Sequence, residues 1–177
     1  MIEFKDFIGL LIGRKRGGKS VADRANWHAE WTIEKYHGEV LPENLYAVEN
    51  IDGNLLLNAG VTLLLNLLIG AGGTAYNNAN AYIGVGESTT AAAATQTGLQ
   101  GSTTTFKAMD SGYPSATNQT VTFRATFGSA DANIAWNEFT IVNASSDSGT
   151  NLNRKVESHG TKASGDSWVI SATITVS

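Results

Sequence analysis

The sequence predicts a mainly β protein, an antiparallel β-sandwich with one buried helix and a basic N-terminal arm. Residues 121–127 and 168–176 alternate apolar with polar side chains, as strands with one buried face and one solvent-facing side do. Residues 59–70 repeat apolar side chains at helical spacing, and no helical pattern follows them. Strands that are separated by turns rather than by crossover helices favour an antiparallel arrangement over a parallel sheet.

Length and composition fit one domain with an N-terminal extension. A chain of 177 residues can bury a hydrophobic core without disulfides, and we divide it into an arm with a short helix at 1–30 and a sandwich module at 31–177. The absence of cysteine excludes disulfides, thiolate metal sites and cysteine nucleophiles. Charged residues make up 16% of the chain, below the roughly 25% of an average globular protein, which predicts a polar but weakly charged surface.

The first 24 residues are basic, whereas the rest of the chain is acidic. They hold six basic and three acidic side chains, a net charge of +3, which leaves −7 for the remainder because the whole chain carries −4. Such an arm can bind an acidic protein surface, nucleic acid or an anionic membrane. We expect it to bind a neighbouring subunit, with apolar side chains as anchors and basic side chains as the source of attraction. The anchors are Phe4, Phe7, Ile8, Leu10 and Leu11, and the charges are Arg14, Lys15, Arg16 and Lys19.

Two features bear on where the protein is expected to reside. No apolar run reaches the roughly 18 residues that a membrane-spanning helix needs. The N-terminal segment carries charges on both sides of its apolar stretch and lacks a small-residue cleavage site, so it is a poor secretory signal. We expect a protein that is made and kept in a cytoplasm until it assembles.

The first elements of the chain are predicted to be a short helix and a hairpin. Residues 20–31 are predicted to be helical, with Ser20 as the N-cap. The pattern then changes to two-residue alternation, which predicts a strand pair within residues 31–52, turning near His37.

The strongest helix signal covers residues 59–69. Asn58 is the expected N-cap and Gly70 the expected C-terminal stop. Because this helix is apolar nearly all round, we expect it to be buried, as a core helix rather than a membrane span.

Further strands are predicted beyond residue 80. Residues 81–86 alternate with glycines and are predicted to form a buried strand with close backbone approach, followed by a long polar connection at 87–100. Residues 133–143 keep a strand composition but change phase, and a β-bulge near Asn137 and Glu138 would reconcile the two phases.

Residues 13–20 match the GxxxxGK[ST] pattern of a phosphate-binding loop. In such a site Lys19 would reach the terminal phosphates and Ser20 would bind magnesium. The fold that carries this loop needs a parallel sheet with repeated helical crossovers, which the rest of this sequence does not predict. We therefore prefer a solvated basic loop and keep a P-loop nucleotide hydrolase as an alternative.

No metal-binding or catalytic pattern stands out in the sequence. The three histidines, His28, His37 and His159, lack the spacing of metal ligands. Neither a nucleophile elbow nor a pair of catalytic carboxylates is present. We expect no metal, no cofactor and no enzymatic activity.

Glu138 is the one charge that the pattern singles out. It lies within an apolar strand, and an unpaired buried carboxylate is costly. We expect a structural ion pair or hydrogen bond to Arg124, Arg154 or Lys155 rather than a catalytic role.

Several segments between residues 53 and 177 resemble a widespread module of tailed-bacteriophage virion proteins. They are NLLLNAGV, AYIGVGESTTA, TVTFRATFGSADAN, WNEFTIVN, NRKVES and TKASGDSWVISATITV, in this order. The module has a Gly-rich strand and loop, an Asn-Glu pair before an aromatic strand and a Thr-Lys pair before the last strand. The resemblance is to proteins of the capsid-decoration, tail-fibre and collar type.

The resemblance implies a non-enzymatic virion structural protein that attaches to a capsid or tail. Its implied partners are other virion subunits and copies of this chain, with a trimer as one arrangement, rather than a membrane or nucleic acid. Its implied location is the virion, after assembly in the host bacterial cytoplasm. A receptor-binding fibre tip is a further alternative, in which loops 87–105 and 144–153 touch a host glycan or protein.

Overall fold

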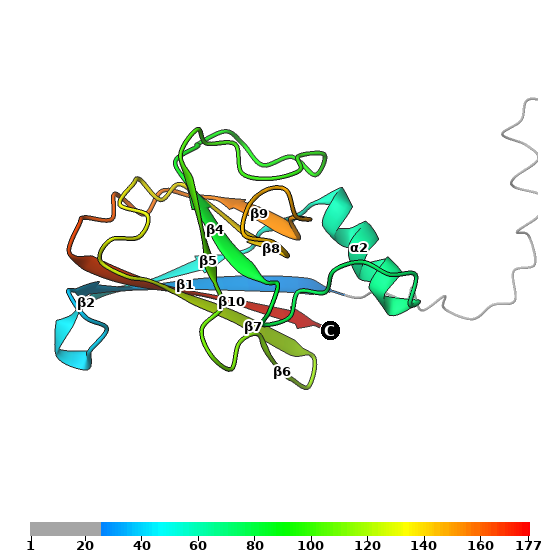
Figure 1. Cartoon of the computed structure of the whole chain (residues 1–177), viewed down its shortest axis with the longest axis horizontal. Coiled ribbons are helices and arrows are strands. Elements are labelled where there is room, and N and C mark those ends of the chain that lie inside the picture. The colour runs from blue at the N-terminus through cyan, green and yellow to red at the C-terminus, as the bar shows by residue number, and fades with distance from the viewer. Residues whose placement is uncertain (1–25) are drawn as a thin grey trace, which may run out of the picture.

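The computed structural model describes residues 26–177, which form two five-stranded antiparallel sheets and one α-helix. The sheets lie face to face, as Figure 1 shows, and the strand orders are β2-β1-β10-β7-β6 and β3-β9-β8-β4-β5. The mainly β, antiparallel sandwich architecture is therefore confirmed. The elements are β1 (Trp27–His37), the 3₁₀ turn η1 (Pro42–Asn44), β2 (Leu45–Asp52), β3 (Leu55–Leu56), α2 (Asn58–Leu68), β4 (Tyr82–Gly86), β5 (Thr104–Ala108), β6 (Ser115–Thr117), β7 (Thr120–Phe127), β8 (Glu138–Val142), β9 (Asn153–Val156) and β10 (Asp166–Val176).

Strand β10 is the centre of the first sheet. It pairs with β1 along its whole length, from Trp27 opposite Val176 to His37 opposite Asp166, and with β7 on its other side. The alternation of more and less buried side chains in β7 and β10 follows the sequence pattern except at two positions of β10: Val169 is buried, and Val176 is exposed.

The short helix expected at residues 20–31 is wrong for its last five residues, which belong to β1. Ala29, Trp31 and Ile33 are all buried, so the two-residue period extends further toward the N-terminus than expected. Pairing with β10 supplies hydrogen-bond partners along this segment, and this long-range pairing overrides the local helical signal. Residues 20–25 of that prediction lie outside the described residues.

Glycines let the strands of the second sheet approach closely. A Cβ atom at Gly84 would lie 2.6 Å from the Phe106 ring, and one at Gly86 would lie 2.6 Å from Glu138 Oε1. This is the close approach that the 81–86 pattern predicts. The expected bulge near Glu138 is instead the start of a strand, because β8 begins there and runs opposite β4 without a shift of register.

Aromatic rings fill the space between the two sheets. The Trp136 ring meets the rings of Phe127 and Trp168 edge-on, each at a centroid distance of 4.9 Å. Its Nε1 donates a hydrogen bond to the Ala132 carbonyl at 3.0 Å, so the one polar atom of the ring is satisfied within the core.

Helix α2 lies at one end of the sandwich, beside the start of β1 and the C-terminus (Figure 1). It is not buried as expected, because only Gly60 and Leu63 are. The helix approaches the body on one side, where a Cβ atom at Gly60 would lie 2.5 Å from the Leu152 carbonyl oxygen. The predicted cap is also wrong: the N-cap is Leu57, and no side chain caps the helix. Gly70 follows the helix with φ +70°, a conformation that favours glycine.

Candidate functional site

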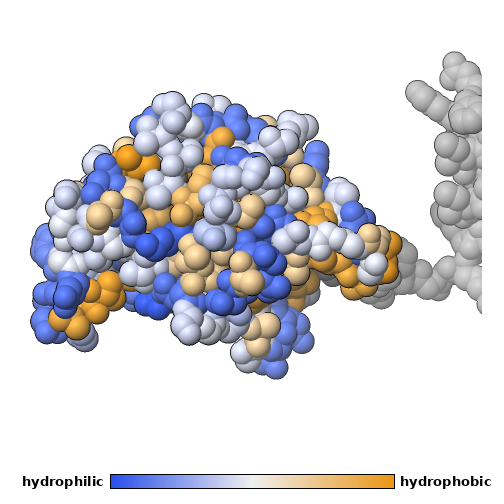
Figure 2. Space-filling model, in the orientation of Figure 1, coloured by the Kyte–Doolittle hydropathy of each residue, from blue (hydrophilic) through white to orange (hydrophobic). Residues whose placement is uncertain are grey.

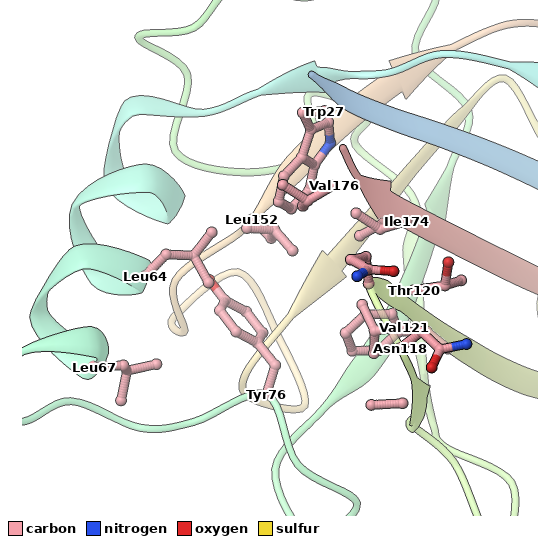
Figure 3. A pocket seen from close by; sticks show the side chains of 13 residues that line it. Trp27, Leu64, Leu67, Tyr76, Asn118, Thr120, Val121, Leu152, Ile174 and Val176 are labelled. Carbon is pink, nitrogen blue, oxygen red and sulfur yellow. The ribbon is translucent and has the colours of Figure 1, made fainter. Parts of the chain in front are cut away.

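An apolar groove opens between α2 and the adjacent strand ends of the first sheet. Its volume is about 550 Å³. Leu64 and Leu67 of α2 form one wall, and Val121, Ile174 and Val176 of β7 and β10 lie across from them (Figure 3). Trp27, at the start of β1, lines the same groove.

The walls of the groove are fixed by packing against the hydrophobic core and by hydrogen bonds between Asn26 and Ser177. Leu64, Trp27 and Val121 pack against the main hydrophobic cluster. The last residue of the chain, Ser177, exchanges two backbone hydrogen bonds with Asn26, at 2.6 and 3.0 Å. These contacts fix the sheet side of the groove, and Asn26, the first described residue, directly precedes Trp27 in its lining.

Tyr76 gives the groove a rigid aromatic side. Its hydroxyl donates a hydrogen bond to the Thr150 carbonyl at 3.0 Å, and burial raises the pKa of Tyr76 above its usual value. Of the described residues, no carboxylate, lysine, arginine or histidine lines the groove. The lining suits apolar side chains, which gain by leaving water, and supplies no acid–base chemistry of its own.

The outer face of α2 extends this apolar surface beyond the groove. Val61, Leu65, Leu68 and Ile69 are exposed, and Leu68 retains 80% of its accessible surface. Their spacing of four, three and one residues places them on one side of the helix. Figure 2 shows hydrophobic residues gathered at this end of the molecule, over α2. Contiguous exposed apolar surface of this kind marks an interaction site.

A second apolar patch covers the β1–β2 hairpin at the other end of the first sheet. It comprises the exposed side chains of Val40, Leu41, Leu45, Tyr46 and Val48. None of these five side chains lines the groove beside α2. The groove and the outer face of α2 together are thus the stronger candidate, and we refer to them as the α2 end.

Two exposed acidic side chains lie on the outer face of the first sheet, near the start of β1. Glu30 and Asp52 are 66% and 84% exposed and lie 3.3 and 3.7 Å from His28. Neither lines the groove, because both lie on the face opposite to the buried Trp31 and Ile51.

The structure places Glu138 against Arg154, one of its three expected partners. Both side chains are fully buried, and Arg154 Nη2 lies 2.7 Å from Glu138 Oε2. Glu138 also accepts hydrogen bonds from the backbone amides of Ser88, Gln100 and Gly101. The pair therefore ties the long connection after β4 to the centre of the second sheet.

The other two basic candidates have different partners. Arg124 pairs with Asp110 at 2.8 Å, and Lys155 pairs with Glu157 at 3.0 Å. The nine arm residues expected to bind a neighbour, and the P-loop pattern at 13–20, lie outside the described residues.

The loops suggested for a receptor-binding tip contact each other. Asp147 accepts hydrogen bonds from the Leu99 amide at 3.2 Å and from Asn151 Nδ2 at 3.1 Å, and the same Asn151 amide donates to the Thr97 carbonyl at 2.9 Å. Burial raises the pKa of Asp147 although both hydrogen bonds favour its charged form. The contact joins 87–105 to 144–153.

Sequence reasoning missed a charged cluster formed by Lys35, Glu49 and His159. Lys35 Nζ and His159 Nδ1 each lie 2.5 Å from an oxygen of Glu49. Burial opposes ionisation of Glu49, but the hydrogen bonds from Lys35 and His159 outweigh it, so its pKa is lowered. No sequence signal could have found the cluster, because β2 pairs with β1 whereas His159 comes from a loop more than a hundred residues away.

Within residues 26–177, no group of three or more acidic, histidine or cysteine side chains could hold a metal ion. None of the helices in this part of the chain is long and apolar enough to cross a membrane.

Comparison of the chain with protein families, curated proteins and solved structures finds no match.

Proposed function

We propose that this chain is a non-enzymatic structural subunit of a bacteriophage particle, attached to a capsid or tail, that assembles with copies of itself through the α2 end. The sequence resemblance of residues 53–177 supports the assignment to a bacteriophage particle. The apolar surface of the α2 end supports assembly of copies through that end.

The observation that carries the proposal is the exposure of the apolar side chains of α2. Leu65, Leu68 and Ile69 are 58%, 80% and 77% exposed. Full burial of one such side chain is worth roughly 1.5–3 kcal/mol, so a subunit that covers several of them gains enough to associate. Symmetric assembly repeats the same contact in every copy and multiplies a modest affinity.

The outer face of the first sheet has the character of a solvated surface. Thr120 and Thr175 are hydrogen bonded through their hydroxyls at 2.9 Å, and Thr122 and Thr173 at 3.3 Å. These cross-strand pairs give neighbouring strands a polar, uncharged outer surface. The contrast with the α2 end supports assembly through that end.

Deletion of residues 1–20 tests the role of the arm. We expect the truncated chain to keep the melting temperature of the intact protein, because the described core lies entirely within residues 26–177. We expect it to lose assembly, measured by sedimentation velocity at equal protein concentrations, because it lacks the apolar anchors and most of the basic charge.

A charge variant separates the two contributions of the arm. Replacing Arg14, Lys15, Arg16 and Lys19 with alanine keeps the apolar anchors, so this variant should assemble more weakly than the intact chain and with less dependence on salt. A truncated protein that assembles as fully as the intact chain would show that the arm plays no part.

A further inference from the structure

We propose that the groove is the binding site for the apolar segment at residues 4–11 of the N-terminal arm of a neighbouring copy. This inference rests on the proposed assembly and names its partner. The groove and the segment match in chemistry: mostly aliphatic and aromatic residues line the groove, with the uncharged polar Asn118, Gln119 and Thr120 among them, and five of the eight residues of the segment are apolar and large.

The spacing of the segment matches that of known groove-binding peptides. Phe4, Phe7, Ile8 and Leu11 follow the i, i+3, i+4, i+7 pattern by which an amphipathic helix lays one face into a hydrophobic groove. Lys5 and the following aspartate interrupt the apolar residues at positions that this pattern leaves facing solvent.

The length of the arm favours a neighbouring copy over the chain's own groove. Trp27 lines the groove, so the arm leaves the domain at the edge of the groove itself. Fourteen residues, 12–25, separate the apolar segment from the domain, and a stretch of this length spans up to about 45–50 Å when extended. A segment that folded back into the groove of its own chain would need only a short turn between residue 11 and Trp27. A linker of fourteen residues is longer than such a turn needs and is long enough to reach a second molecule.

Net charge supports binding between copies. The linker carries Arg14, Lys15, Arg16 and Lys19, whereas the chain after residue 24 has a net charge of −7. The attraction between a basic linker and an acidic neighbour guides docking and is screened by salt.

A disulfide trap tests the inference, because the chain contains no cysteine of its own. One sample carries Gly9→Cys, which keeps all the apolar anchors of the arm, and the other carries Ala116→Cys, a small change at a residue that lines the groove. The two are mixed at equal concentration and oxidised. We expect a cross-linked product of twice the chain mass of 18.7 kDa on a non-reducing gel, containing one copy of each variant.

The matched control pairs Gly9→Cys with Thr62→Cys, an exposed position on α2 that does not line the groove. This pair should give little cross-linked product. A chain that carries both Gly9→Cys and Ala116→Cys should cross-link between copies. A product that stays at the mass of one chain would assign the groove to the chain's own arm and overturn the inference.

The outcomes also separate this inference from the proposed function. If the intact protein assembles but the Gly9–Ala116 pair cross-links no better than the control, the groove has another occupant and only the inference fails. If neither assembly nor cross-linking occurs at any concentration, both fail.

Discussion

Replacing Arg154 with methionine is expected to lower the free energy of unfolding by about 3–5 kcal/mol. Methionine keeps the apolar length of the side chain but leaves the Glu138 carboxylate without its partner charge. Both side chains are 0% exposed, so no solvent can take over the role of the guanidinium. Unfolding in urea, followed by tryptophan fluorescence, measures the loss, because three of the four tryptophans are buried in the core.

Arg124→Met is the matched control for this variant. Arg124 also pairs with a carboxylate, that of Asp110, at 2.8 Å, but both side chains remain partly accessible to solvent. An ion pair of this kind contributes about 0–1 kcal/mol. An Arg154→Met variant that is no less stable than Arg124→Met would contradict the conclusion that the buried Glu138–Arg154 pair stabilises the second sheet.

Placing two glutamates on the outer face of α2, as Leu65→Glu and Leu68→Glu together, is expected to weaken assembly about 100-fold or more. Burial of two leucines is worth roughly 3–6 kcal/mol, and each 1.4 kcal/mol corresponds to a factor of ten in the dissociation constant. The fold should be retained, because both side chains are exposed in the isolated chain. Analytical ultracentrifugation over a range of concentrations measures the change.

The control for this variant adds the same charge to the same helix at polar positions. Thr62 and Asn66 are exposed and polar, so Thr62→Glu with Asn66→Glu should assemble as the unchanged chain does. Equal weakening by both variants would show that charge on the helix, rather than loss of the leucine surface, is responsible.

The strands could be predicted because their signal is local. In β7 and β10 the alternation of side chains indicates which face is buried, and the structure follows it except at Val169 and Val176. The segment before Trp31 carries a local helical pattern, but its strand structure depends on β10, which lies more than 130 residues away in the sequence. Strand pairing between segments so far apart cannot be recognised from a short stretch of the sequence.

Burial of α2 could not be judged from its composition. An apolar helix is normally buried, yet this one lies at the end of the sandwich, and only its Gly60 and Leu63 are buried. The groove was equally hidden, since its walls come from residues as far apart as Trp27 and Val176. The need of Glu138 for a basic partner could be predicted, because the cost of an unpaired buried carboxylate follows from the strand pattern alone.

The mass of the intact chain in solution tests the central claim most directly. Light scattering coupled to size exclusion, over a wide range of protein concentrations, should give a mass that is a multiple of 18.7 kDa and that falls toward one chain on dilution. A mass of one chain at every concentration, for a protein that carries its arm and an unaltered α2 end, would contradict assembly through this surface.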